Sequence, residues 1–380
     1  PIPLWVAESK EGEKYYALGK TGKYYEPWKE KVKDDFEVYF KGKNVGVVKD
    51  FKDLKFIGEE RVFDTWMDSS ISELVLLKYN SDEDFFKRSY PCSLRPQGKE
   101  IIRTWLYYTL LRGFLETGKN CFEDVWINQH ILDGKGYKMS KSKGNIIDPQ
   151  KLLKLYGAEA IRFWAATEGD LAKQDLKCSE ERIKAEMKTL NKLINISKFV
   201  LMFPKPPRKY KLTMTDKLFV DYMDNLTCEI EKSYSEYNFY NPALELRNFI
   251  WEIFASHYIE LVKSRAYNQD GKFTEDESYS ARWTLHFLLE RLLHLLYPIV
   301  PQVSSLIAEE KGIDLIKSEF PKVKVGKINL VLIKKIMEFN SKVWKEKKEK
   351  GISLRDEIKM RIPEELVDYE KDLKGCHGLF

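Results

Sequence analysis

Residues 138–145 read Lys138-Met139-Ser140-Lys141-Ser142-Lys143-Gly144-Asn145. A glycine-rich turn, residues 133–136, precedes them, and an apolar run at residues 125–127 precedes the turn. Because the lysines alternate with residues of little bulk, the segment predicts a mobile cationic loop that can close over a polyphosphate. Asp148-Pro149 follows and predicts a helix start, with aspartate as the N-cap and proline at the first helical position.

Lysines spaced in this way suit the expulsion of pyrophosphate from ATP. Negative charge builds on the leaving phosphates in the transition state, and cations that reach them only then lower the barrier selectively. Lys138 and Lys141 can face one ligand, Ser140 and Ser142 can hydrogen-bond phosphate or backbone, and Gly144 permits a sharp turn. Loss of one such lysine is expected to slow the reaction by about 10²–10³-fold. The alternative is a solvated hairpin tip, and the complete string between a strand and a capped helix favours catalysis.

The length and composition of the chain are those of a folded protein with more than one domain. The 380 residues suffice for two or three domains, and 43% of them are apolar. The net charge of +5, from 64 basic and 59 acidic residues, permits an RNA partner without requiring one. Five scattered cysteines without a CxxC pair predict free thiols in a reducing cytoplasm and no zinc site. No apolar run approaches membrane-spanning length, so we expect no membrane partner.

The order of patterns predicts an α/β part followed by an all-helical part. Residues 1 to about 60 read as strands, with a hairpin around residues 19–22 and a strand at 36–40. Residues 99–113 predict a helix that ends near Gly113, and residues 122–132 predict one buried strand. From about residue 179 the apolar spacing is that of long amphipathic helices. A last basic helix is expected at 327–350, with a thin tail after Pro363.

Two further segments have the composition of a ligand pocket. In residues 64–70, Trp66 stands among short polar residues, as on the apolar wall of a small pocket, although a core tryptophan is the commoner case. In residues 94–105, Gly98 at a helix entrance lets backbone amides approach a ligand. Glu100 then favours the helix dipole and could accept ribose hydroxyls, and helix capping alone explains it equally well.

Taken together, these segments resemble a valyl-tRNA synthetase of archaeal or eukaryotic type, a class I aminoacyl-tRNA synthetase. The strings DTWMDSS (64–70), RPQGKEIIRTW (95–105) and KMSKSKGNIIDP (138–149) follow the family's order. Leu295-Leu296-Tyr297-Pro298-Ile299-Val300-Pro301 and Gly351-Ile352-Ser353-Leu354 resemble segments of its anticodon-binding domain. The resemblance implies the second half of a Rossmann-like catalytic domain followed by a helical-bundle anticodon-binding domain.

The resemblance also implies domain limits and roles. The catalytic half with the KMSKS loop would span 1–165, a helical stem-contact region and linker 166–205, the anticodon-binding domain 206–330, and a basic helix and tail 331–380. Lys138, Ser140, Lys141 and Ser142 would be catalytic, with ATP and Mg²⁺ as cofactors. The residues expected at the adenylate are Gln97, Gly98, Glu100, His130, Met139 and Lys141. Trp66 would line the valine pocket.

Three departures from the family pattern shape the functional hypotheses. The HIGH motif and the editing domain are absent, Glu100 stands where aspartate is usual, and residues 6–9 lack the cysteines of a zinc knob. The chain begins at Pro1, so a fragment, a processed product or one half of a split protein is expected. The leading hypothesis is the C-terminal half of a valine–tRNA ligase that needs an N-terminal partner carrying HIGH and editing. The alternatives are an inert tRNA-binding fragment and half of an isoleucyl- or leucyl-type enzyme.

On the RNA side, two basic clusters could contact tRNA(Val). One lies in the linker and comprises Lys205, Arg208, Lys209 and Lys211. The other lies beside Trp344 on the last helix and comprises Lys342, Lys345, Lys347, Lys348 and Lys350. Lysines near an aromatic ring suit phosphate contact and stacking on unpaired bases. Glu346 and Glu349 interleave with the second cluster, as on an ordinary solvated face.

Overall fold

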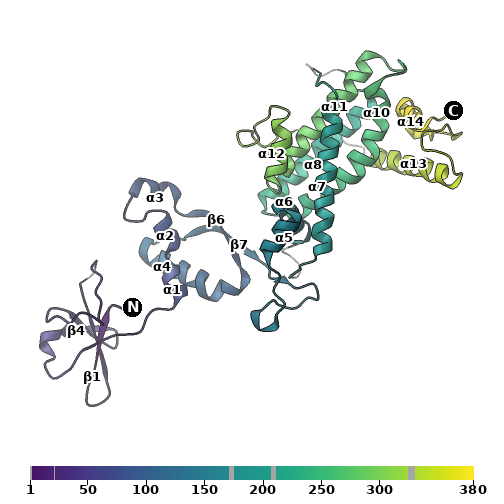
Figure 1. Cartoon of the computed structure of the whole chain (residues 1–380). Helices are drawn as coiled ribbons and strands as arrows, with labels where there is room; N and C mark the ends of the chain where they lie inside the picture. The colour runs from purple at the N-terminus through teal and green to yellow at the C-terminus, as the bar shows by residue number, and fades with distance from the viewer. Residues whose placement is uncertain (1, 21, 171–174, 207–210, 324–329) are drawn as a thin grey trace. The chain divides into compact units, whose positions relative to one another are not determined.

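The computed structural model describes the whole chain except residues 1, 21, 171–174, 207–210 and 324–329. Backbone contacts divide it into two units, Pro1–Asn128 and Gln129–Phe380, and each is described here by itself (Figure 1). The expected organisation, an α/β part followed by an all-helical part, is confirmed in outline. The contact division lies at 128/129, whereas the domain limits proposed from the sequence, including the one at 165, stay predictions.

The first part of the N-terminal unit is a five-stranded antiparallel sheet in the order β4-β3-β2-β1-β5. Its elements are β1 (Leu4–Glu8), β2 (Lys14–Leu18), β3 (Glu37–Phe40), β4 (Lys43–Val47), the short η1 (Val48–Asp50) and β5 (Ile57–Gly58). Trp5, Tyr25 and Phe36 fill its core. The predicted hairpin around residues 19–22 is wrong. Tyr25 lies outside the strands because its ring packs into the core, 4.9 Å from that of Phe36, and β2 pairs with β1 and β3 instead.

The second part of this unit contains two parallel strands joined by a helical crossover. The elements are α1 (Thr65–Ser69), α2 (Ser72–Leu76), α3 (Glu83–Ser89), β6 (Cys92–Gly98), η2 (Lys99–Ile101), the π-helical η3 (Ile102–Leu106), α4 (Tyr107–Thr117) and β7 (Phe122–Asn128). The crossover continues past Gly113 and ends at Gly118, which has a φ of 70°. Gly113 lies inside the helix, where a Cβ would collide with the Cys121 thiol, so this glycine serves close packing rather than a helix end. The predicted helix end is therefore wrong.

The C-terminal unit begins with a small α/β segment. It contains β8 (Ile131–Leu132), η4 (Lys141–Lys143), α5 (Pro149–Tyr156), α6 (Ala158–Glu168) and β9 (Leu176–Lys177), with β8 parallel to β9. The strand predicted at 122–132 is two strands, because the chain leaves β7 at Asn128 and pairs anew at Ile131. The α5 start is confirmed, since the Asp148 side chain accepts a hydrogen bond from Gln150 N at 2.9 Å.

Long helices form the rest of the C-terminal unit. They are α7 (Glu180–Leu201), α8 (Met214–Ser235), α9 (Tyr240–Asn248), the π-helical η5 (Phe249–Tyr258), α10 (Ile259–Tyr267), α11 (Glu275–Leu296) and α12 (Pro301–Glu309). One large core joins them, and the predicted apolar faces of α7 and α11 lie in or against it. Two hydrogen bonds join α6 to this bundle. Arg162 Nε donates to Ile299 O at 2.8 Å, and Glu159 Oε2 accepts from Val303 N at 3.2 Å.

The C-terminal segment folds onto this bundle. It comprises α13 (Leu330–Glu349), η6 (Glu364–Tyr369) and α14 (Glu370–His377). The prediction of a thin tail after Pro363 is wrong, because Leu366 and Leu373 are buried in the main core. Arg265 of α10 also joins the segment to the bundle through charge, since Nε donates to Asp372 at 2.8 Å and Nη1 to Asp216 at 2.7 Å. α14 lies alongside α10 (Figure 1).

Candidate active site

The lysine loop of the C-terminal unit opens with a tight polar turn. Asp133 N donates to Tyr137 O at 2.9 Å, and an isolated bridge pairs Leu132 with Lys138. The Asp133 carboxylate accepts from Lys135 N and Tyr137 N at 3.0 and 2.8 Å. Hydrogen bonds, first that from the Asn145 side chain, lower the pKa of Asp133. The aspartate is therefore an ionised anchor at the base of the loop.

Asn145 closes the loop from its other end. Its Oδ1 accepts from Ser140 N at 3.0 Å, and its Nδ2 donates to Asp133 Oδ2 at 2.8 Å and to Lys138 O at 3.3 Å. One amide thus joins the opening turn to the lysine segment. The sequence analysis missed both Asp133 and Asn145. The sequence contains a signal for both roles. Each residue is an aspartate or asparagine next to a glycine at one end of the loop, and such side chains often hydrogen-bond the nearby backbone.

Within the loop, the serines and Met139 have internal partners. Ser140 Oγ accepts from Lys143 N at 3.3 Å, which caps η4, and lies 3.2 Å from Ser142 Oγ. Gly144 ends this turn with a φ of 63°, the left-handed conformation that favours glycine. The thioether of Met139 accepts from Ile147 N at 3.3 Å. These contacts hold the loop in shape, and the predicted contacts of Met139, Ser140 and Ser142 with ATP stay predictions.

The lysine side chains have no such partners. Lys138, Lys141 and Lys143 are all exposed, and none forms an ion pair with another described residue. The Lys143 ammonium lies 5.9 Å from the centre of the Tyr137 ring, which is an exposed contact of small energy. The loop therefore presents three unneutralised cations on a backbone fixed by Asn145, an arrangement that fits an anionic ligand such as a polyphosphate.

His130 lies at the base of the same segment. Its backbone N donates to Asp175 Oδ1 at 3.0 Å, and its carbonyl accepts from Leu176 N at 2.9 Å. These bonds align β8 with β9. They show what the backbone of His130 does, and the predicted contact of its ring with adenine stays a prediction.

The other predicted site residues belong to the N-terminal unit. Gln97 and Gly98 end β6, and the carboxyl ends of parallel strands are where open α/β sheets bind ligands. Gln97 is buried, and neither polar atom of its side chain has a hydrogen-bond partner among the described residues. Such orphaned groups are costly unless a further partner satisfies them. The Glu100 carboxylate lies against Gly98, so a Cβ at this position would displace the end of the Glu100 side chain.

Trp66 lies in the short helix α1 of the same unit. The Asp64 side chain caps α1 by accepting from Trp66 N at 2.7 Å, and the indole of Trp66 is 39% exposed. The neighbouring Trp105 Nε1 donates to Ser69 O at 3.2 Å, which fixes α1 against the crossover. Trp66 is therefore not a core tryptophan, and the assignment to the valine pocket stays a prediction.

Lys347 corrects the predicted RNA surface on the last helix. The side chain is fully buried, and its ammonium donates to the main-chain carbonyls of Leu354, Asp356 and His377 at 2.8, 2.6 and 2.8 Å. Burial lowers the pKa of this lysine. Lys347 therefore joins the C-terminal segment to α13, and it cannot contact RNA in this conformation.

The remaining members of the two basic clusters differ in their neighbours. Trp344 is half-buried, with its ring 5.3 Å from that of His257 and 5.4 Å from that of His377. Lys205 pairs with Glu290 at 3.1 Å. The predicted cluster members Arg208 and Lys209 lie outside the described residues.

Among the described residues, no cluster of three or more His, Cys, Asp or Glu side chains could hold a metal ion, and no helix is long and apolar enough to span a membrane.

Comparison with known protein families defines the class of both parts. Residues 1–179 match the model for class I tRNA synthetases of the isoleucyl, leucyl, methionyl and valyl group. Residues 216–362 match the model for the anticodon-binding domain of tRNA ligases. The fold and the lysine loop are therefore those of a class I aminoacyl-tRNA synthetase segment joined to an anticodon-binding domain.

Curated relatives narrow this class. The chain is 40% identical to the valine–tRNA ligase of Pyrobaculum aerophilum over 99% of its own length and 46% of that protein. It is 38% identical to that of Nanoarchaeum equitans, over 100% of this chain and 47% of the relative, and 38% identical to that of Aeropyrum pernix, over 99% and 45%. The chain belongs to the valine–tRNA ligase family, and it spans about half the length of these relatives.

Solved structures agree on the fold. A leucyl-tRNA synthetase from Agrobacterium radiobacter K84, in a ternary complex with tRNA and LeuAMS, matches 85% of this chain and 42% of its own with a TM-score of 0.57 at 15% identity. A methionyl-tRNA synthetase from Mycobacterium tuberculosis, in complex with methionyl-adenylate, matches 69% of this chain and 56% of its own with a TM-score of 0.54 at 19% identity. At these identities the likeness concerns the fold alone.

Proposed function

We propose that this chain supplies the KMSKS side of the active site and the anticodon-binding domain of a valine–tRNA ligase. The reaction is the activation of valine by ATP with Mg²⁺, followed by transfer to tRNA(Val). The observation that carries the proposal is the loop at 138–145, in which three exposed ammonium groups stand on a backbone held by Asn145. Five free thiols support a cytoplasmic location.

In this proposal the lysines act on the leaving pyrophosphate. Lys138 and Lys141 stabilise the charge that develops on the phosphate oxygens, with Ser142 as a further donor. Ser140 contributes through its cap on η4, which orients the lysines between which it lies. Gln97, Gly98, Glu100, His130 and Met139 are assigned to the adenylate, and Trp66 to the valine side chain. Mg²⁺, when bound, neutralises phosphate charge, and the described residues offer lysines for the phosphates rather than a carboxylate cage for the ion.

We further propose that activity requires a segment bearing the HIGH motif and an editing domain, on a separate N-terminal half. The curated relatives are about twice as long as the aligned region. In the N-terminal unit, α4 exposes an apolar stripe at 107, 110, 111 and 114, and the Gln97 side chain has orphaned polar atoms. Both features are expected if a further protein segment packs against this unit. Exposed apolar stripes are normally covered by such a segment, and buried polar groups normally find a hydrogen-bond partner.

Two other functions remain as alternatives with distinct signatures. The intact KMSKS string at 138–142 argues against an inert tRNA-binding fragment, because a pure RNA binder has no use for it. Half of an isoleucyl- or leucyl-type synthetase would share the architecture. It differs in the amino acid that drives ATP–pyrophosphate exchange.

The decisive experiment is valine-dependent ATP–pyrophosphate exchange, with this chain alone and with an added N-terminal half from a relative. We expect exchange only in the mixture, and a loss of about 10²–10³-fold for Lys138→Ala or Lys141→Ala. Lys135→Ala is the matched control, because it removes a lysine from the opening turn and keeps the backbone bond to Asp133. Exchange driven by isoleucine or leucine would reassign the enzyme. No exchange in any mixture, with tRNA binding retained, would make the chain a binding fragment.

A further inference from the structure

Lys311, in the turn after α12, has a histidine as its side-chain partner. Its amine nitrogen lies 2.9 Å from Nδ1 of His286 on α11 and 3.4 Å from the carbonyl oxygen of the same residue. The carboxylate of Glu290, one helical turn further on, is paired with Lys205 at 3.1 Å instead. Lys311 therefore donates to a neutral base where most paired lysines donate to an acid.

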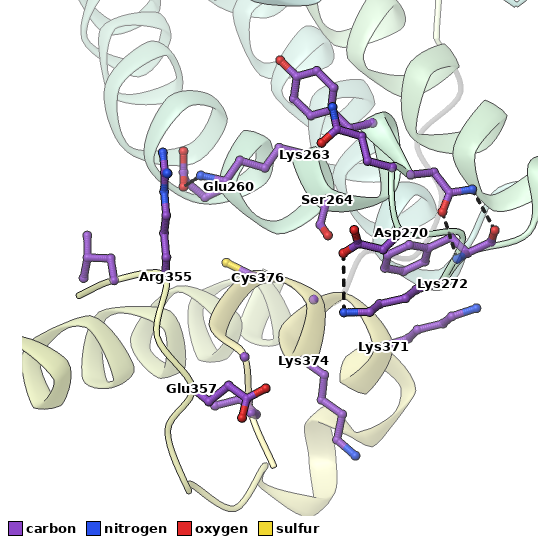
Figure 2. Close-up of a pocket in the computed structure, with 18 of the residues that line it drawn as sticks. Glu260, Lys263, Ser264, Asp270, Lys272, Arg355, Glu357, Lys371, Lys374 and Cys376 are labelled. Atoms are coloured by element: carbon purple, nitrogen blue, oxygen red, sulfur yellow. Dashed lines mark hydrogen bonds and ion pairs between the residues drawn. The ribbon is translucent and has the colours of Figure 1, made fainter. Parts of the chain in front are cut away.

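The lysines of a nearby region of the same unit show the usual arrangement. A cleft of about 1260 Å³ lies between α10, the following loop and the C-terminal segment, and Figure 2 shows the pair of Lys263 with Glu260 on its wall. Other lysines that line this cleft also have carboxylate partners, which are Asp270 for Lys272, Glu277 for Lys371 and Glu370 for Lys374. A carboxylate partner keeps a lysine protonated, which makes it a poor nucleophile.

The end of α12 fixes the backbone of Lys311. Gly312 N donates to Glu309 O and Ile313 N donates to Ala308 O, each at 2.9 Å, and Gly312 has a φ of 70°. This pair of bonds is the Schellman motif, which closes a helix with a glycine in the left-handed conformation. Ile313 then packs against the main core. The lysine is therefore carried by a closed helix end.

His286 can act only as a proton acceptor toward this lysine. Its Nε2 lies 2.8 Å from Phe203 O, and a carbonyl oxygen can only accept, so Nε2 carries a hydrogen. In the neutral ring Nδ1 then has a lone pair, to which the Lys311 nitrogen donates. His286 is buried, and burial lowers its pKa to about 4. At neutral pH the ring therefore offers Nδ1 as a base.

The same environment favours the neutral amine of Lys311. Burial lowers its pKa to about 8; the carboxylate of Glu290 opposes this shift, and the charge of Lys205 adds to it. At pH 7.5 about a quarter of such amines are neutral, against about one in a thousand for an ordinary lysine. Lys347, by contrast, is fully buried and gives its three N–H bonds to carbonyl oxygens, whereas Lys311 is only half-buried.

We propose that Lys311 is an acylation site, at which its amine attacks the carbonyl carbon of a small acyl phosphate and His286 Nδ1 accepts the proton. The neutral amine donates one N–H to Nδ1, and its lone pair is left for the carbonyl carbon. The C–N bond forms, the C–O bond to phosphate breaks, and phosphate leaves with the electron pair. The excess proton of the amine passes to Nδ1 and then to water.

The neighbouring charge favours a donor with a phosphate leaving group. The Lys205 side chain is 54% exposed, and its ammonium acts on Lys311 as a like charge, so a cation stands beside the amine. Such a cation attracts the donor and stabilises the departing phosphate. The product is a neutral amide, so the modification removes the charge of Lys311. The site shares no residue with the lysine loop, and the inference does not rest on the proposed function.

The test measures acetylation of the whole chain by acetyl phosphate, lysine by lysine, with mass spectrometry after digestion by a glutamate-specific protease. At pH 7.5 we expect Lys311 to react about tenfold faster than Lys184, which is exposed on α7, because the larger neutral fraction outweighs the lower basicity. Over a pH series the rate at Lys311 should level off above about pH 8, whereas the rate at Lys184 keeps rising. Lys347 should stay unmodified, because it is enclosed.

Two substitutions of surface carboxylates sharpen the pH profile. Glu290→Gln removes the charge that raises the pKa of Lys311 and leaves Lys205 without its partner, so the midpoint of the Lys311 profile should move to lower pH. Glu310→Gln is the matched control, because Glu310 is exposed beside Lys311 in the sequence and is not among the groups that shift its pKa. We expect this control to leave the midpoint unchanged.

Replacement of the base completes the design. His286→Gln, with its fold checked by circular dichroism, should slow acetylation of Lys311 about tenfold or more and leave Lys184 unchanged. A Lys311 rate no greater than that of Lys184 at pH 7.5, or one that rises in parallel with it through about pH 9.5, would overturn the proposal. Acetylation of Lys347 as fast as that of Lys311 would also overturn it, because the label would then report an opened chain.

Discussion

Helices α4 and α11 share one sequence pattern and have opposite environments. In α11 the residues at i, i+3, i+4 and i+7 are Leu285, Leu288, Leu289 and Leu292, each 0% exposed. In α4 the residues at the same spacing are Tyr107, Leu110, Leu111 and Phe114, which are 56%, 37%, 42% and 53% exposed. The pattern therefore marks an apolar face and does not say what covers it. The other helices of the bundle bury the apolar face of α11, whereas the described residues of the N-terminal unit leave the apolar stripe of α4 exposed.

A fall in pH should destabilise the helical bundle of the C-terminal unit, and this is the largest effect that we expect. Burial lowers the pKa of His257, His286 and His377, all in the C-terminal unit, to about 4. Because their unfolded pKa is near 6.5, the unfolded state binds more protons below that pH, and stability falls as the pH drops from about 6.5 to 4. We expect the bundle to lose about 2 kcal/mol per histidine between pH 7 and 5.

Urea unfolding at a series of pH values measures this loss. His257→Asn should remove about one third of the pH slope, because one of three contributing groups is gone. A free energy of unfolding that stays flat between pH 7 and 5 would contradict the assignment of these histidines as neutral core groups.

Removal of the Arg265 guanidinium comes next. Burial acts to raise the pKa of Asp216, but the ion pair with Arg265 outweighs it, so the pKa is lowered and the carboxylate stays charged. Arg265→Met leaves Asp216 and Asp372 as buried, unpaired carboxyls, at a cost of about 3–5 kcal/mol. In the variant both carboxyls are easier to protonate than in the unfolded chain. Its deficit at neutral pH should therefore shrink as the pH falls.

The matched control for Arg265 is Lys217→Gln. It breaks the exposed pair of Lys217 with Asp221, and we expect a cost of about 0.2–0.5 kcal/mol in the same urea titration. Equal costs for the two variants would show that the buried network does not hold α14 to the bundle.

Truncation of one leucine on each helix tests the comparison directly. Leu289→Ala opens a cavity in the closed core and should cost about 2–5 kcal/mol. Leu115→Ala on α4, where the side chain is 72% exposed, should change the free energy of unfolding by no more than about 0.5 kcal/mol. Leu111→Glu should likewise leave this chain stable but prevent assembly with an N-terminal half, measured by co-elution. Assembly of that variant at normal yield would exclude α4 as the docking face.

The smallest effect concerns the lysine loop. Asn145→Ala removes the hydrogen bonds to Ser140, Asp133 and Lys138, which should weaken the loop by about 1 kcal/mol. We expect trypsin to cut after the loop lysines roughly fivefold faster, with the global unfolding midpoint nearly unchanged. Asn191→Ala, on the exposed face of α7, is the control. Equal cleavage rates in the two variants would show that Asn145 does not fix the loop.

Local signals in the sequence predicted the elements that depend on local physics. Asp148 and Pro149 predicted the start of α5, and the leucine spacing predicted the buried face of α11, because caps and helical periodicity act within a few residues. The KMSKS string likewise predicted the lysine loop and its family. The hairpin at 19–22, the end of the crossover near Gly113 and the thin tail after Pro363 were wrong, since distant contacts decide each of them.

By itself, the sequence determined the order of the two fold classes, the cationic loop and the family, since these are written in short strings and periodicities. Only the tertiary structure decided which lysines face solvent. Lys347 and Lys184 look alike in sequence, yet Lys347 is enclosed by three carbonyls and Lys184 is exposed on α7. Burial and charge pairing arise from segments far apart in the chain, such as residues 347 and 377, which no local pattern connects.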